Sequence, residues 1–288
     1  MKRFIISTLV LALALTAFGP VAFAQNRGGG NGGNNGNGGN GGNGGNGGNA
    51  GQACSGVPIA HLESLPVEAL SQVELDAITF LREEEKLARD VYATLALSWD
   101  IPVFSKIARA EQRHMNMVGL LLDRNDVNDP IADDTIGAFT NPELEALFIT
   151  LVDSGESSLE QALLVGATIE DLDIADIQEM ISESDNLDIA FVGYNLAKGS
   201  RNHLRAFSRA LEMNGFDPYA AQYLDQDEVD EIITSDHERG IVYDEYGDVL
   251  ATCGGGRGRG NGSCDGSGQG RGRGQGRGPG NGSCATTS

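Results

Sequence analysis

The sequence predicts an all-α fold, a four-helix bundle with short accessory helices and a polar site buried at its centre. Three observations lead to this prediction. Four long stretches repeat apolar residues at spacings of three and four, which places these residues on one helix face. Each stretch carries an acid or a histidine on that apolar face near its middle. No stretch shows the sustained period-two alternation of a half-buried strand.

The chain of 288 residues begins with the features of a secretory signal peptide, residues 1–24. Lys2 and Arg3 precede the apolar run Ile5–Ala17, and the small-x-small pattern at residues 22–24 predicts cleavage near Ala24. The apolar run is short for a bilayer span. We therefore expect a protein exported to a periplasm or to the medium, without a membrane span in the mature chain; an uncleaved anchor is the alternative.

Two segments are dominated by glycine: residues 25–57, rich in Gly and Asn, and residues 250–288, rich in Gly and Arg. Neither can bury enough apolar surface to offset its chain entropy, so we expect both to be disordered. Residues 58–249 remain as one folded domain. The Arg-Gly tail resembles RNA-binding tracts, but an exported protein meets little RNA, which favours a flexible spacer or a surface-adhering tail.

The composition is strongly acidic, with a formal net charge of -21 at pH 7. Such a charge disfavours partners that are themselves anionic, so neither nucleic acid nor an anionic membrane is expected as a partner. It is compatible with solubility or with the capture of cations. Whether the chain forms a homo-oligomer is left open by the sequence.

Four cysteines lie outside the strongly helical region, and an even number in an exported chain suggests disulfides with three possible connectivities. One bridge between Cys54 and Cys253 would tie the two ends of the domain together. Cys264 and Cys284 each end a Gly-Asn-Gly-Ser-Cys repeat and could pair with each other. No C-x-x-C spacing occurs, which makes a metal-binding role for these residues weaker.

Local signals mark the ends of the helices. Ser71-Gln72-Val73-Glu74 is a capping box, Pro102 ends the first helix and begins the second, and Asn141-Pro142 begins a short one. Asn214-Gly215 ends the fourth long helix. The predicted helices, in chain order, span about 71–99, 102–122, 141–155, 157–182, 187–213 and 225–235.

The apolar faces of the long helices are interrupted by polar residues of the metal-ligand type. These residues are Glu85 on the first helix, Glu111 and His114 on the second, Glu170 and Asp173 on the third, and His203 on the fourth. A buried carboxylate is costly unless it is paired, protonated or bound to a metal. Inward Glu residues together with a Glu-x-x-His are typical of di-metal carboxylate bundles, so we predict a metal site.

The run Glu83-Glu84-Glu85 divides by direction on its helix. We expect Glu83, Lys86 and Asp90 on a solvent-facing stripe with Asp76 and Thr79. Glu84 lies on a neighbouring apolar stripe, where we expect a boundary residue that pairs with an arginine.

These motifs resemble the first half of the ferritin-like superfamily, closest to the rubrerythrin pattern. The resemblance rests on Glu85-x-x-Ala88-Arg89-x-x-Tyr92 followed by Glu111-x-x-His114. It implies that Glu85, Glu111 and His114 are metal ligands, with Glu111 as a bridge, and that Tyr92 lies beside the site in a catalytic role or simply in the core. More narrowly, the chain is similar to an exported bacterial ferritin-like family known only as a domain of unknown function.

The second half departs from that pattern. Glu170 and Asp173 match the family's paired acids, but Ser200-Arg201-Asn202-His203 keeps the histidine and has serine where the second bridging Glu stands in the family. The resemblance therefore leaves open a mononuclear site and a dinuclear site in which Asp173 compensates.

The expected function is that of an exported protein binding one or two Fe or Mn ions, with Zn not excluded by the ligand types. With a redox-active metal, the resemblance implies reaction with oxygen or peroxide and a ferroxidase-like oxidoreductase activity. Two alternatives of another class are a non-enzymatic structural protein whose low-complexity tails mediate interactions, and a metal-buffering protein. An ion-pair core without metal is a further alternative.

Overall fold

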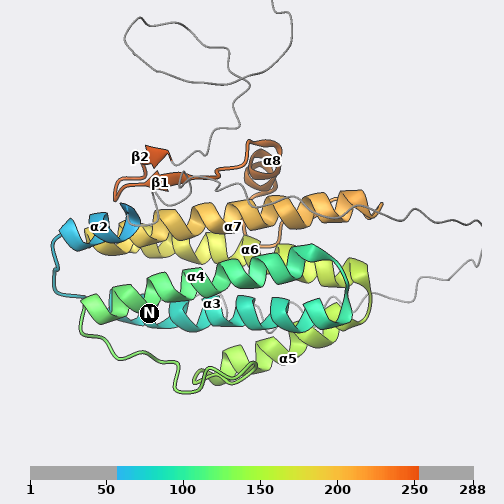
Figure 1. The fold of residues 1–288 in the computed structure, drawn as a ribbon, viewed down its shortest axis with the longest axis horizontal. Coiled ribbons are helices and arrows are strands. Elements are labelled where there is room, and N and C mark those ends of the chain that lie inside the picture. Colours follow the sequence, from blue (N-terminus) through green and yellow to red (C-terminus); the bar gives the residue numbers. More distant parts are fainter. Residues whose placement is uncertain (1–56, 253–288) are drawn as a thin grey trace, which may run out of the picture. The chain divides into compact units, whose positions relative to one another are not determined.

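The computed structural model describes residues 57–252, and helices dominate this part of the chain (Figure 1). The all-α class expected from the sequence is confirmed. The predicted signal peptide, the tail beyond Thr252, the four cysteines and all but the last residue of the Gly/Asn-rich segment lie outside the described residues. None of the helices between residues 57 and 252 is both long and apolar enough to cross a membrane.

The predicted helices lie within about two residues of their expected ends, and three elements are additional. The helices are α2 (Val57–Ser64), α3 (Gln72–Ser98), α4 (Pro102–Arg124), α5 (Pro142–Glu156), α6 (Leu159–Glu183), α7 (Leu187–Met213) and α8 (Gln226–Thr234). The antiparallel strands are β1 (Ile241–Tyr243) and β2 (Val249–Thr252). Neither α2 nor this hairpin was expected from the sequence, because both are too short to show a clear hydrophobic period.

Side-chain caps fix where α3, α5 and α6 begin. The Ser71 hydroxyl accepts a hydrogen bond from the Glu74 amide, while the Glu74 carboxylate accepts one from the Ser71 amide, so the capping box is complete. Asn141 and Ser158 cap α5 and α6 in the same way, each through its side-chain oxygen. These bonds satisfy amides that have no partner inside the helix.

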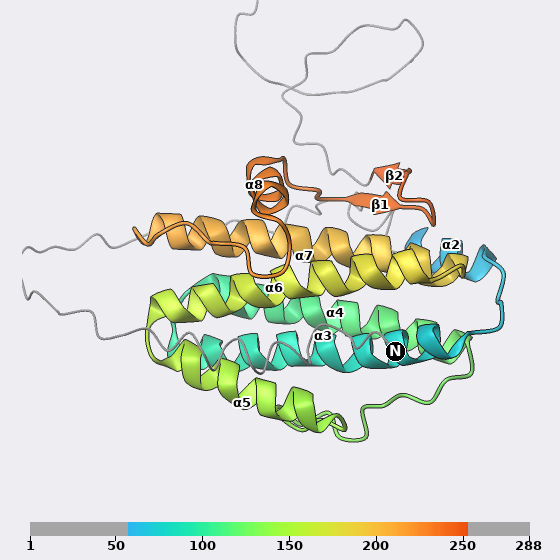
Figure 2. The same cartoon turned by 180° about the vertical axis from the view of Figure 1, so that it is seen from behind.

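The four long helices lie side by side. α3 packs on α4 and α6 on α7, and these two pairs meet along α3–α6 and along α4–α7. α4 and α7 face the viewer in Figure 1, and α6 and α3 do so in Figure 2. α5 covers α3 and α6, whereas α8 and the hairpin pack on α7. The α3–α6 seam is therefore covered by another helix.

Two apolar clusters fill the interior, one toward each end of the long helices. One contains Val91, Phe104 and Phe207, and the other contains Ile78, Val118 and Val192. Along α3, α4 and α7 the change from one cluster to the other falls where the inward acids and histidines stand. The polar residues thus form a layer between two apolar clusters.

The prediction of a solvent-facing stripe on α3 is wrong for three of its residues. Glu83, Lys86 and Asp90 are buried, because the segment that connects α4 to α5 returns over this face. Lys86 Nζ donates to Asp90 Oδ2 at 2.5 Å and to the Thr135 carbonyl at 2.8 Å. The Glu83 carboxylate accepts a hydrogen bond from the Thr140 amide at 2.6 Å. Helix periodicity shows which residues avoid the central seam, but not that a loop covers them.

The expected pairing of Glu84 with an arginine is also wrong. Glu84 is buried beside α5 and α6, where burial and the nearby Asp176 carboxylate raise its pKa well above the usual value. The two arginines of this helix pair elsewhere: Arg82 contacts Asp129 at 2.8 Å, and Arg89 contacts Asp90 at 2.8 Å and Asp134 at 2.7 Å.

Replacing Lys86 by alanine should destabilise the fold by about 1.5–3 kcal/mol, because the buried Asp90 would lose a charge-assisted hydrogen bond and keep only Arg89 as a cation. Chemical denaturation of Lys86→Ala and of the exposed Lys106→Ala would measure this. The second variant should change the free energy of unfolding by less than about 0.5 kcal/mol. Equal stability of the two variants would show that the Lys86–Asp90 pair does not hold the α4–α5 segment in place.

Candidate metal centre

The seven residues that the sequence singled out converge on one layer between the helices. α3 contributes Glu85 and Tyr92, α4 contributes Glu111 and His114, α6 contributes Glu170 and Asp173, and α7 contributes His203. Each comes from the middle of its helix, where spacings of three, four and seven keep the side chains on the inward face. The carboxylates and Tyr92 are buried, and the two histidines are partly buried.

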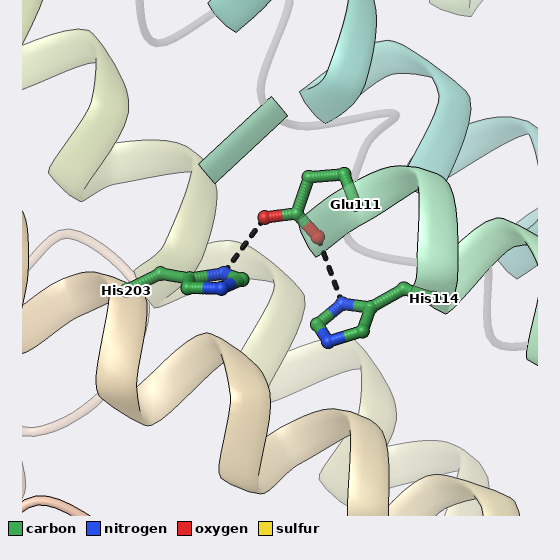
Figure 3. Close-up of side chains that lie close together, drawn as sticks. All are labelled: Glu111, His114 and His203. Carbon is green, nitrogen blue, oxygen red and sulfur yellow. Dashed lines mark ion pairs between the residues drawn. The ribbon is translucent and has the colours of Figure 1, made fainter. Parts of the chain in front are cut away.

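Glu111 lies at the centre of this layer, between two imidazole rings (Figure 3). Its Oε2 is 2.8 Å from Nδ1 of His114, and its Oε1 is 2.7 Å from Nδ1 of His203. The two rings lie nearly parallel, with their centroids 5.3 Å apart. One carboxylate therefore joins a histidine of its own helix to a histidine of α7.

A second carboxylate lies close to the same nitrogen of each imidazole. Glu85 Oε2 is 3.2 Å from His114 Nδ1, and Glu170 Oε2 is 3.3 Å from His203 Nδ1. The layer thus has two similar halves, Glu85–His114 and Glu170–His203, which share Glu111. The halves differ at their outer ends, because the Tyr92 hydroxyl donates to Glu170 Oε1 at 2.6 Å.

Asp173 belongs to the same layer, but its hydrogen-bond partner is a serine and not a histidine. The Ser200 hydroxyl of α7 donates to Asp173 Oδ2, and both residues are buried. Ser200 was noted in the sequence only as a departure from the family pattern. Its place on the inward face of α7, three residues before His203, is the signal that it would contact the acids of α6.

Gly199 makes room for the His114 ring. A Cβ atom at this position would overlap the Nε2 and Cε1 atoms of His114. The glycine therefore lets α7 approach α4 closely enough for both imidazoles to reach Glu111.

The charges of the layer perturb one another strongly. Burial raises the pKa of Glu85 and of Glu170 to about 7, although His114 and His203 act in the opposite direction. Burial also opposes ionisation of Glu111, but His203 and His114 hold its pKa below the usual value. Burial lowers the pKa of His203, yet Glu111 and Glu170 raise it to about 10. Burial and the carboxylates of Glu85 and Glu170 raise the pKa of Asp173.

Several buried atoms of this layer have no hydrogen-bond partner, among them Glu85 Oε1, Glu111 Oε1 and His203 Nδ1. The last two are 2.7 Å apart but are not aligned as a hydrogen bond. Buried polar atoms normally have partners, so atoms left over in one small volume point to a missing ligand. Glu111, His114 and His203 each offer a ligand atom, and these three atoms lie within 4.8 Å of one another. The donor set fits a divalent metal ion.

Comparisons with known proteins match the helical part of the chain. Residues 74–236 match a family model described as an uncharacterized protein domain, DUF2202. An uncharacterized protein of Methanocaldococcus jannaschii, MJ0754, is 49% identical over 183 residues, which are 64% of this chain and 98% of that protein. The crystal structure of the hypothetical protein MJ0754 is similar, with a TM-score of 0.60 and 50% identity over 61% of this chain and 99% of that one.

The metal-free protein should lose stability as the pH rises from about 4.5 to 10. A carboxyl group whose folded pKa is raised to about 7, like Glu85 or Glu170, stabilises the fold below pH 4.5 and loses that contribution as the pH passes 7. His203 loses its contribution between its ordinary pKa and about 10. Between pH 4.5 and 7 the free energy of unfolding should fall by up to about 3 kcal/mol less in Glu170→Gln than in the parent protein.

Denaturant unfolding of metal-free protein at pH 5, 7 and 9 would measure these changes, with the exposed Glu212→Gln as the matched variant. A stability that is flat over this range, or a decline that persists unchanged in Glu170→Gln, would contradict the assigned protonation states.

Proposed function

The chain belongs to the family of the uncharacterized protein domain DUF2202, and from the geometry of its buried polar layer we propose that it binds iron or manganese at the centre of a ferritin-like four-helix bundle. The observation that supports this most is the position of Glu111. A single carboxylate lies within 2.8 Å of two imidazole nitrogens that come from different helices.

The two halves of the layer suggest how the ligands divide. Glu85 and His114 would hold one ion, Glu170 and His203 would hold another, and Glu111 would bridge them. Carboxylate and imidazole ligands without thiolate suit Fe and Mn, and they also suit Zn. Asp173, held by Ser200, would be an adjustable ligand. With Ser200 in place of a second bridging carboxylate, a single ion shared by the two halves is the other arrangement.

We propose further that the centre reacts with oxygen or peroxide, as an oxidoreductase of the ferroxidase-like kind. Bound iron or manganese would supply the redox chemistry. The residues of the chain would hold the protons, because Glu85 and Glu170 have pKa values near 7 and can exchange a proton close to neutrality. Tyr92 would act through Glu170, to which its hydroxyl donates.

A second candidate belongs to another class, an extracytoplasmic protein that uses the same ligands for a structural or a buffered metal. The tails would then carry its interactions. Both histidines are partly exposed, which would let a bound metal ion exchange with solvent. This exposure favours the buffering role. A core of ion pairs without metal is less well supported, because apolar replacements of such buried charges often stabilise a protein. Export of the chain remains part of the proposal and rests on the predicted signal peptide.

Protein purified from its native compartment should contain about one or two equivalents of Fe or Mn. A double variant, Glu111→Ala/His114→Ala, should lose the metal, because it removes the shared carboxylate and one imidazole. The matched control is Glu212→Ala/His237→Ala, in which both residues are exposed and the metal should remain. Absence of metal from the parent protein, even after anaerobic loading with Fe(II), would exclude the oxidoreductase proposal.

Replacing Tyr92 by phenylalanine should leave the metal content unchanged and lower peroxide turnover by about 10²-fold, if the hydroxyl assists proton transfer at Glu170. Stopped-flow measurement of peroxide consumption would test this, with the exposed Tyr246→Phe as control. Unchanged turnover in Tyr92→Phe, accompanied by a loss of stability of about 1 kcal/mol, would assign the hydroxyl a purely structural role.

A further inference from the structure

The positive charges of this acidic protein are concentrated on two helices. Residues 57–252 contain forty Asp and Glu but only twelve Lys and Arg, and eight of those twelve lie on α4 and α7. Seven of these eight lie in residues 106–113 of α4 or residues 198–209 of α7, beside the polar layer in sequence. Glu111 is the single acid in these two segments. These seven are Lys106, Arg109, Arg113, Lys198, Arg201, Arg205 and Arg209. The α3 and α6 helices, in contrast, are rich in acids.

The polar layer is most exposed along the same two helices. The side chains of His114 and His203 are 14% and 12% exposed, whereas those of Glu85, Glu111 and Glu170 are no more than 2% exposed. On the opposite side, α5 covers the seam between α3 and α6. Among the described residues, the layer is therefore most open to solvent at the α4–α7 seam, where the two imidazoles lie.

Not all the cations of α4 and α7 are neutralised. Arg201 and Arg205 share one carboxylate, that of Glu238, which balances only one of their two positive charges. Arg113, adjacent to His114, is exposed, and within residues 57–252 its guanidinium donates only to the Arg109 carbonyl. Lys106 lies seven residues before Arg113, on the same face of α4, and is also exposed. Neither Lys106 nor Arg113 forms an ion pair within the described part of the chain.

We infer that the molecule reaching this site is a small anion, or a small molecule that reacts through an anionic group, and that it enters at the α4–α7 seam past Arg113 and Lys106. An unbalanced positive rim raises the local concentration of anions and lowers that of cations. Metal cations would therefore pass slowly through this face, which favours a metal that stays bound and reacts with oxygen or peroxide over rapid turnover of Fe(II) entering here. The reaction of the anion at the site rests on the proposed metal-binding function. Its recognition by the exposed cations does not.

The first test follows recognition in the metal-free protein. Azide is titrated at low ionic strength, and the ¹⁵N signals of the imidazoles of His114 and His203 are recorded by NMR. Saturable shifts are expected in the parent and in Arg113→Lys, which keeps the charge. Arg113→Glu should weaken azide binding at least about tenfold. Equal binding in Arg113→Glu and the parent, or no effect of azide on either imidazole, would overturn the inference.

The second test uses the Fe(II)-loaded protein and compares an anionic ligand with a neutral one. Stopped-flow rate constants for azide should fall at least about tenfold in Arg113→Glu and with added salt, while those for nitric oxide should not change. A parallel fall for both ligands would overturn the inference, because it would reflect a distorted site. If no iron binds but the azide titration depends on charge, the proposed function fails and the anion site stands.

Discussion

The structure depends on how one buried carboxylate is compensated. Glu111 lies at the centre of the four long helices, where an isolated negative charge would be strongly unfavourable. It is stabilised because His114 of its own helix and His203 of α7 approach it from two sides. That requirement brings α4 and α7 close together, which in turn requires glycine at position 199. Glu85 and Glu170 then complete the surroundings of each imidazole.

The rest of the fold isolates this layer and leaves one approach to it. Apolar clusters pack toward either end of the layer, and α5 covers the α3–α6 seam. Within residues 57–252 no helix covers α4 and α7 in the same way, and the two imidazoles on these helices are partly exposed. In the proposed function, the buried carboxylates and imidazoles would bind the cation, and the exposed cations of α4 would select the molecules that reach it. Metal binding would then take place in the core, and selection of the anion at the surface.

Local signals were sufficient to predict much of this arrangement. One capping box, the positions of proline and the hydrophobic periods identified the helices, and acids on the apolar faces identified the polar layer. Periodicity could not show that the α4–α5 segment buries Lys86, since this depends on contacts distant in sequence. It also could not show that Ser200 holds Asp173. The short α2 and the hairpin of β1 and β2 depend on packing against α7 and carry too few residues for a recognisable pattern.

Anomalous diffraction from crystals of the protein loaded anaerobically with Fe(II) or Mn(II) would test the central claim most directly, because it locates the metal without reference to activity. Our account requires a peak beside Glu111 that is bordered by the Nδ1 atoms of His114 and His203, or two peaks bridged by that carboxylate. A layer without any peak, in which Glu111 keeps its direct ion pairs with both imidazoles, would contradict it. The polar layer would then be an ion-pair core, and the function would have to be sought elsewhere in the chain.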